Sequence, residues 1–501
     1  MAQYVRLYEL ESEFQDKRNN DYFEPWVSLT VESNNRVDYN KTKEEKLLGS
    51  YLTFKITGDG NIRWHADNAN QTRVIQYKKN DGEWTTITSA TGNSAPSIAV
   101  VSGDTVQFRG DNPAYGHVYN TSYGDIYANS FSGSSCGFEA YGNIMSLIDS
   151  DDFANATAIT ANAAFAMLFF HCTGLTSVSD LMLPAKTLSG YTYRGLFNYC
   201  SSLTDYPRIY AETLDLECMR GLFYYCTSLT GVPKDYLPWL TVPKGAYSQM
   251  FLGCSSLVAA PDLPGTTTED SSYVMMFNEC TSLTNIPTKM AATTAGYRTM
   301  ASMFQDCTSL TGVPADFIQV TSVSSNTFES MFKGCTALTH GPEIIPAPAL
   351  SGGTCVDMFS GCTSLLNAPQ IIATGLGSYS CGRMFQGCSS LVSVQSVLPA
   401  TVLSSNSYNC MFKGCTSLTG APELPAATVP TSGYSGMFSG CTSLLYIKCL
   451  ATNISAAGAV YAWADGVPTS SNGVFVKAAS MSSWPRGVSG IPNNWSIQDA
   501  T

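Results

Sequence analysis

Charged residues are scarce in this sequence. Of its 501 residues only 13% are Asp, Glu, Lys or Arg, and the formal net charge is −12. Proteins that bind nucleic acid gather Lys and Arg against the phosphates, and such clusters are absent here. We therefore expect no nucleic-acid partner.

Long apolar runs are also missing. No stretch approaches the roughly 18 residues that a membrane-spanning helix needs. Residues 1–11 include acidic residues, Glu9 and Glu11, where a secretory signal would have its apolar core. The expectation is a protein made in the cytoplasm, with no export signal and no membrane insertion.

Histidine is rare, and recognisable catalytic patterns are absent. The four histidines are scattered, no CxxC pair occurs, and no nucleophile stands beside a base in a recurrent motif. The acidic residues at 149–152 can bind a cation, although carboxylates before a helix more commonly cap it. We predict neither an enzyme nor a metal or cofactor site.

One motif recurs throughout the middle of the chain. It has eleven copies, 26–28 residues apart, each anchored by a cysteine: Cys172, Cys200, Cys226, Cys254, Cys280, Cys307, Cys335, Cys362, Cys388, Cys415 and Cys441. A unit of this size cannot bury its apolar face alone and must stack on its neighbours. The repeat predicts a solenoid.

Fixed positions within each copy predict its local structure. With the cysteine as position 0, apolar residues stand at −7, −4, −3 and 0, and position −3 is always Phe. That spacing indicates about two turns of helix ending at the cysteine. Ser or Thr at +1, Leu at +3 and usually Pro at +7 indicate a corner followed by a short strand, with the corner hydroxyls aligned as a ladder. The predicted fold is an α/β solenoid of about eleven repeats.

The seventeen cysteines admit disulfides or metal as alternatives. However, eleven lie on the buried stripe and four others fall in or beside the same predicted helices: Cys218, Cys355, Cys381 and Cys410. We interpret them as reduced core thiols that pack as small hydrophobes.

The repeat resembles a known family. Met437-Phe438, Gly440-Cys441 and Thr442-Ser443-Leu444 show the pattern Met-Phe-x-Gly-Cys-Thr-Ser-Leu, which a Pro-x-Leu-Pro-Ala segment often follows. It is similar to the BspA-like leucine-rich repeat, found in surface proteins of gut Bacteroidales and in virion proteins of their crAss-like phages. The resemblance covers about residues 160–450 and implies an adhesive or ligand-presenting solenoid without catalytic residues.

The remaining segments surround the repeats. Residues 1–48 are predicted to dock on a partner through Tyr4, Tyr8, Tyr22, Phe23 and Trp26; a solvated leader is the alternative.

Alternating apolar residues in 49–112 predict an all-β, immunoglobulin-like sandwich. Residues 113–160 are expected to be a linker and N-terminal cap, 161–448 the leucine-rich repeats, and 449–501 a C-terminal cap with Trp463, Trp484 and Trp495 as its lid.

Variable loops follow the prolines, and scaffolds with variable loops commonly present binding surfaces. Tyr236 and Trp239 are the candidate ligand contacts, with packing against the neighbouring turn as the alternative.

The combined expectation is a non-enzymatic phage virion protein, a head or tail fibre or a decoration. Its N-terminal region would dock on other virion proteins, and its repeats would bind a glycan or protein of the host surface. A bacterial surface adhesin and a purely architectural virion part are the alternatives, and a homo-oligomer is left open.

Overall fold

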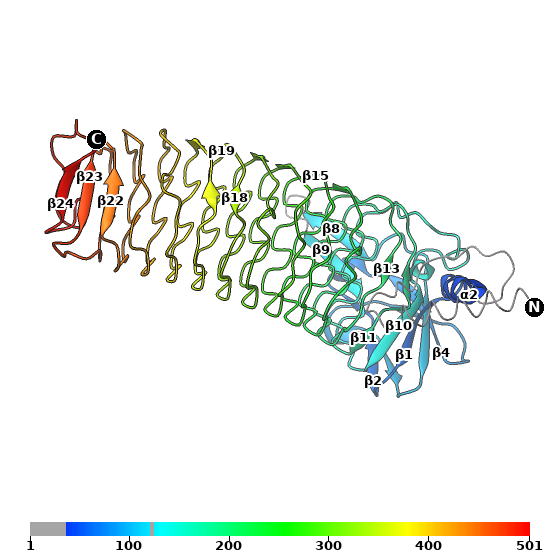
Figure 1. The fold of residues 1–501 in the computed structure, drawn as a ribbon. Coiled ribbons are helices and arrows are strands. Elements are labelled where there is room, and N and C mark those ends of the chain that lie inside the picture. Colours follow the sequence, from blue (N-terminus) through cyan, green and yellow to red (C-terminus); the bar gives the residue numbers. More distant parts are fainter. Residues whose placement is uncertain (1–36, 121–124) are drawn as a thin grey trace, which may run out of the picture.

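The protein is an elongated rod. A computed structural model describes residues 37–120 and 125–501. Figure 1 shows a β unit at one end, a stack of similar turns and a small three-stranded sheet at the other end. One buried apolar core runs from Leu52 to Trp495, so the β unit, the stack and the closing sheet share a single interior.

The N-terminal part begins with helix α2 and continues in strands. Its elements are α2 Val37–Leu48, β1 Leu52–Ile56, β2 Gly60–Arg63, β3 His65–Ala66, η1 Ala69–Gln71, β4 Val74–Lys79, β5 Thr85–Thr88, η2 Gly92–Ser94, β6 Ser97–Val100, β7 Thr105–Arg109, β8 Gly116–Asn120, β9 Asp125–Ser130, β10 Phe138–Asn143 and η3 Ile144–Leu147. No helix in the described part of the chain has the length and apolar content to cross a bilayer.

The β unit is antiparallel, as expected, but the immunoglobulin-like sandwich is not confirmed. Its main sheet has the order β5-β4-β7-β1-β10, with β2–β6 and β3–β9–β8 as smaller sheets. Strand β10 comes from the stretch expected to be linker and cap, and it pairs with β1. On its other edge β10 pairs in parallel with β12, so the sheet continues into the solenoid.

Each repeat contains a tight coil, and the predicted helix is wrong. The residues at positions −9, −5 and −1 have positive φ, for example Arg298, Ser302 and Asp306 at 54° to 59°. Alternate amides bond in two ways. The N–H of Phe304 donates to the carbonyl of Met331 in the next turn at 2.9 Å, and the N–H of Cys307 donates to the carbonyl of Phe304 at 3.3 Å. Every second amide is therefore used between turns, which an α-helix cannot do.

The wrong prediction has a simple physical cause. The coil repeats every four residues, so its buried residues also fall three, four and seven positions apart. Over a window of eight residues this pattern matches the 3.6-residue period of a helix. The chain is a β-type solenoid with tight coils in place of helices.

Short parallel strands form the opposite side of the stack. The strands are β11 Leu175–Ser177, β12 Leu181–Leu183, β13 Arg208–Ile209, β14 Thr241–Val242, β15 Thr267–Thr268, β16 Thr294–Ala295, β17 Ser322–Val323, β18 Ile344–Ile345, β19 Ala349–Leu350, β20 Gln370–Ile371 and β21 Gly375–Leu376. Their pairs are parallel, as the sequence predicted.

Two ladders hold the interior. The Phe rings at position −3 of successive turns stack with centroids 5.4–6.0 Å apart and planes within 15°. From Cys200 onward each anchor thiol donates to the carbonyl of the Phe at −3 in the preceding turn, with Sγ–O distances of 3.0–3.2 Å. The cysteines are free, as predicted, and they also act as hydrogen-bond donors.

The predicted ladder of corner hydroxyls forms in five of the eleven copies. Thr227 Oγ1 donates to the carbonyl of Ser201 at 3.3 Å, and Thr416 Oγ1 donates to that of Ser389 at 3.1 Å. Each hydroxyl thus bonds the equivalent residue one turn earlier.

Both ends of the stack are covered. At the N-terminal end the amide of Phe131 donates to Leu168 O at 2.8 Å, and Phe131 O accepts the thiol of Cys172. The stretch 113–160 thus caps the first turn, as well as supplying strands.

At the C-terminal end the coil continues for a twelfth turn, in which Val467 occupies the cysteine position. Strands β22 Tyr446–Cys449, β23 Val474–Lys477 and β24 Ser496–Asp499 close the stack. Trp463 and Trp484 stack at 5.6 Å, and all three tryptophans of the predicted lid are buried.

Candidate functional site

The type of residue at position −1, just before the anchor cysteine, differs between the first turns and the later ones. Six of the eleven copies have Gly there, with φ of 72–78°. Glycine adopts this left-handed conformation freely. The other five copies hold larger side chains at φ of 54–60°: His171, Tyr199, Tyr225, Glu279 and Asp306. A side chain in this region costs about 1–3 kcal/mol and persists where something compensates for it.

Three of these five residues are aromatic and lie in consecutive turns. With Phe170 and Tyr224 at position −2 they form a continuous group, which we call the tyrosine row. The ring centroids of His171 and Tyr199 are 5.3 Å apart, as are those of Tyr199 and Tyr225. Tyr224 lies 5.4 Å from Tyr199. His171 is exposed and the other four are half-buried.

The far end of the row is fixed by two contacts. The hydroxyl of Tyr225 donates to Glu279 Oε2 at 2.6 Å, and this bond raises the pKa of the phenol. The ring lies over Gly253, where a Cβ atom would approach it to 2.7 Å. Glycine at position −1 of the fourth turn therefore makes room for the last ring of the row.

A polar group beside the tyrosine row has no partner among the described residues. Asn198 occupies position −2 in the turn between Phe170 and Tyr224, and its buried Oδ1 accepts no hydrogen bond from the described residues. A buried acceptor left unpaired costs about 1–3 kcal/mol.

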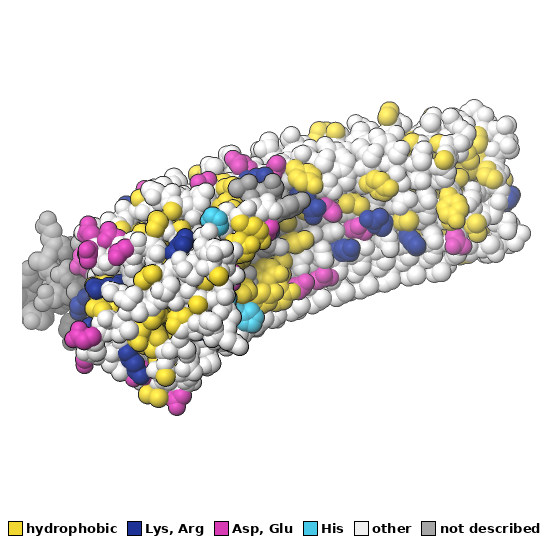
Figure 2. Space-filling model, turned by 180° about the vertical axis from the view of Figure 1, so that it is seen from behind, with side chains coloured by type: hydrophobic (Ala, Val, Ile, Leu, Met, Phe, Trp, Pro, Cys, Tyr) yellow, Lys and Arg dark blue, Asp and Glu magenta, His cyan; other side chains and the backbone are white. Residues whose placement is uncertain are grey.

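This arrangement suits binding. Half-buried aromatic rings with polar edges are enriched where proteins contact other molecules. In Figure 2 hydrophobic side chains gather on the face where the β unit meets the solenoid, and further along the solenoid they occur as smaller separate groups.

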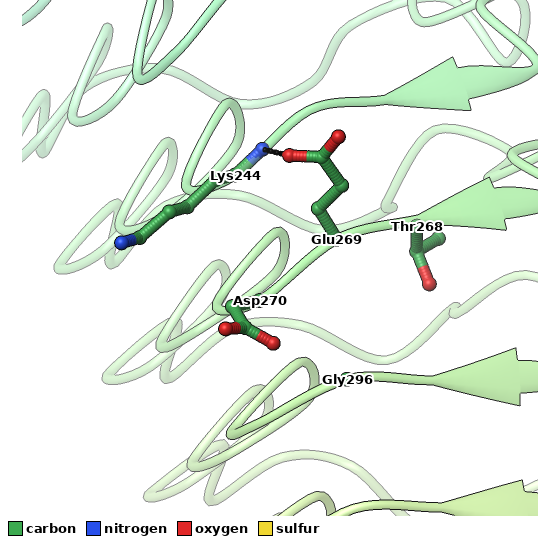
Figure 3. Close-up of a pocket in the computed structure, with 5 residues that line it drawn as sticks. All are labelled: Lys244, Thr268, Glu269, Asp270 and Gly296. Carbon is green, nitrogen blue, oxygen red and sulfur yellow. Dashed lines mark hydrogen bonds between the residues drawn. The ribbon is translucent and has the colours of Figure 1, made fainter.

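A shallow hollow of about 310 Å³ lies a few turns further along. Its lining residues are Lys244, Thr268, Glu269, Asp270 and Gly296. Figure 3 shows the backbone N–H of Lys244 bonded to Glu269 Oε2, at 3.0 Å. Asp270 Oδ1 accepts the N–H of Tyr297 at 2.7 Å. Both carboxylates bond backbone groups at the start of coils, so the hollow is part of the scaffold.

The two loop residues predicted to contact ligand are packed against the preceding turn. Trp239 is 8% exposed, and its Nε1–H donates to Ala211 O at 3.0 Å. The hydroxyl of Tyr236 donates to Pro207 O at 3.1 Å, and burial raises its pKa well above the usual value. Both side chains therefore pack against the neighbouring turn, which was the alternative to ligand contact. The predicted docking residues Tyr4, Tyr8, Tyr22, Phe23 and Trp26 lie outside the described residues.

The acidic stretch at 149–152 shows the capping geometry. Asp149 Oδ1 accepts the N–H groups of Asp151 and Asp152 at 3.1 and 2.9 Å.

The tyrosine row was not among the sites predicted from the sequence. A signal was present, because aromatic residues replace the Gly of position −1 in three consecutive copies. The replacement of Gly by aromatic residues is informative only if position −1 needs a positive φ. A helix has no positive φ at this position, so the helix prediction gave no reason to notice it.

Comparison with known proteins adds little beyond the fold. No family model and no curated protein matches the chain. Two solved leucine-rich repeat proteins are similar to it. The one from T. pallidum is 19% identical over 43% of this chain and 77% of its own, with a TM-score of 0.23. The one from Bacteroides ovatus ATCC 8483 is 14% identical over 73% and 86%, with a TM-score of 0.30. Neither is informative about a phage origin.

Proposed function

We propose that this protein is a non-enzymatic adhesion scaffold whose solenoid presents the tyrosine row to a glycan or protein on a cell surface. The observation that carries the proposal is the conformation of His171, Tyr199 and Tyr225. These side chains occupy a left-handed position that glycine fills in six other turns. Side chains also occupy the positive-φ positions −9 and −5, so the row is set apart by stacked aromatic rings in three consecutive turns at the one position where Gly predominates. A binding role would explain this departure.

The elongated shape agrees with a protein that presents a binding surface. The β unit and α2 lie at one end, beside the first turns of the solenoid, and the remaining turns extend away from them (Figure 1). In the proposed arrangement residues before α2 dock on a larger assembly, and the turns beside the β unit meet the ligand.

We further propose that this assembly is a phage particle, with the protein serving as a head or tail fibre or decoration. The resemblance of the repeat to virion proteins of Bacteroidales phages supports this setting. Seventeen free cysteines support it as well, because thiols in adjacent turns stay reduced most readily in a protein folded in the cytoplasm. A bacterial surface adhesin is the rival. Detection of the protein in purified phage particles and its absence from host envelopes would decide between them.

Binding of the full chain to intact Bacteroidales cells tests the adhesion proposal, with capsule-deficient strains alongside. Tyr199→Gly and Tyr225→Gly remove rings while installing the residue that other turns use. Asp306→Gly makes the same backbone change at the same position outside the row. We expect the two tyrosine variants to lose binding and Asp306→Gly to retain it. Equal binding by all three variants would remove the row from the proposal, and no binding by the folded wild type would favour a purely architectural role.

A further inference from the structure

Next to the tyrosine row, two arginines share one carboxylate. Arg194 and Arg220 stand at position −6 of consecutive turns. Their Nη1 atoms lie 2.8 and 3.0 Å from the same atom, Oε2 of Glu217. The side chains of Arg194 and Glu217 are 12% and 14% exposed, so this contact is largely removed from water.

Other ion pairs along the coil side contain one cation for each anion. Arg383 pairs with Asp357 at 2.7 Å, and Arg298 pairs with Glu329 at 3.4 Å. A single arginine would satisfy Glu217 in the same way. The second places two like charges in adjacent turns, which is unfavourable unless another anion is present.

The pair retains unused donors. A guanidinium has five N–H groups. Among the described residues, Arg194 donates only to Glu217, and Arg220 donates to Glu217 and Gln249. Burial and then the charge of Arg220 lower the pKa of Arg194. Asp125 of β9 also acts on Arg194, without a contact short enough to count as an ion pair.

The arginines and the tyrosine row belong to one surface. Gly195 and Gly221 follow the two arginines directly. A Cβ atom on Gly221 would lie 3.6 Å from Cβ of Tyr224, and one on Gly195 would lie 3.5 Å from Nδ2 of Asn198. Only a glycine backbone therefore separates the two groups.

We infer that this surface binds an anionic glycan, with the arginine pair holding a carboxylate or sulfate group and the tyrosine row contacting the sugar rings. Arginine forms paired hydrogen bonds to such planar or tetrahedral anions. The inference rests on the proposed adhesive function and specifies its ligand class.

The test uses the full chain and three immobilised polysaccharides: polygalacturonate for carboxylate, heparin for sulfate and dextran as a neutral control. The protein carries a net charge of −12, so its overall field repels polyanions. Tighter binding to either acidic polymer than to dextran would therefore require a local cationic site. The acidic polymer that binds more tightly shows whether the site prefers carboxylate or sulfate. Equal or weaker binding to both would overturn the inference.

Two variants at the site should change affinity in opposite directions. Arg220→Gln should weaken binding to the preferred polymer at least tenfold, equivalent to about 1.4 kcal/mol. Glu217→Gln should strengthen it, because both arginines are then free for the ligand. Arg298→Gln, which breaks a one-to-one pair, is the matched control and should leave affinity unchanged. A purely structural arginine pair would give weaker or unchanged binding for Glu217→Gln.

Failure of this inference can be separated from failure of the adhesive function. If cells bind the wild type and Arg220→Gln equally well, the anion assignment is wrong and adhesion stands. If folded wild type binds no cells, adhesion itself fails.

Discussion

At the scale of single residues, most of the stability comes from side chains that repeat. From Phe197 to Phe412 each Phe at position −3 is buried between two equivalent rings, and from Cys200 onward each anchor thiol bonds a carbonyl of the preceding turn. The sequence was sufficient to predict both the buried stripe and the free thiols, because residue type and spacing determine burial. It could not show the thiol bonds, which depend on how the turns stack.

Replacement of Phe332 by Ala should cost about 3–5 kcal/mol of unfolding free energy. The ring is fully buried and lies 5.4–5.6 Å from the rings of Phe304 and Phe359. Hydrogen exchange of the neighbouring turns measures the local loss. Val402→Ala, at a side chain 72% exposed, is the control and should change stability by less than about 0.5 kcal/mol. Equal protection in both variants would contradict the stacking.

Acid should weaken the β unit through Asp104. Hydrogen bonds from Lys79, from Asn80 and from the N–H of Val101 lower the pKa of its carboxyl to about 2 from 3.8. Because the folded-state pKa is the lower one, the carboxylate stabilises the fold above about pH 4, and this contribution disappears as the pH falls towards 2. Urea unfolding at pH 5, 3 and 2 should show wild type more stable than Asp104→Asn, with the difference shrinking in that order. A constant difference would exclude this role.

At the scale of elements, the four-residue coil could not be told from a helix by its sequence. Its buried positions match those of a helix, and the distinction lies in the backbone, where every fourth residue has a positive φ. Gly at position −1 in six copies was the one sequence feature that indicated a positive φ. The strands, the corners and the closing lid were predictable because proline, hydroxyl and tryptophan residues mark them directly. The role of β10 was not, since pairing between distant strands leaves no local pattern.

Gly361→Ala should destabilise the protein by about 1–2 kcal/mol, the cost of a Cβ in the left-handed region. Its φ is +78°, and the nearest atoms to an added Cβ are 3.7 Å away, so there is no steric clash. Gly231→Ala is the control, because Gly231 has no positive φ and open space around it. Thermal unfolding of both variants measures the difference. Equal melting temperatures would mean that φ does not limit the coil.

At the scale of the whole molecule, the rod is one continuous core closed at both ends by unlike caps. Burial of its thiols is a property of this stack as a whole. Sixteen of the seventeen cysteines are buried, and Cys410 is half-buried. Burial raises the pKa of the anchor thiols, for example that of Cys254 to about 12.

Titration with a thiol reagent at pH 8 should therefore detect at most one fast-reacting cysteine, Cys410, in the native protein. All seventeen should react in guanidinium chloride, and a reducing agent should leave the melting temperature unchanged. Cys410→Ser should abolish the fast reaction. Several fast thiols in the native state would mean that the turns open readily.

The bonds between coils also align the peptide dipoles on the coil side of the rod. Along the coil side each inter-turn N–H points to the following turn, as from Phe304 to Met331 and from Phe332 to Met358. Peptide dipoles aligned in this way add, with the positive pole towards the last turn. The N-terminal cap accordingly supplies a donor, the amide of Phe131, and the C-terminal segment supplies an acceptor, the carbonyl of Val488, which Ala464 N–H bonds. The two ends are complementary in polarity and cannot exchange places, so the coil side behaves as a long oriented dipole.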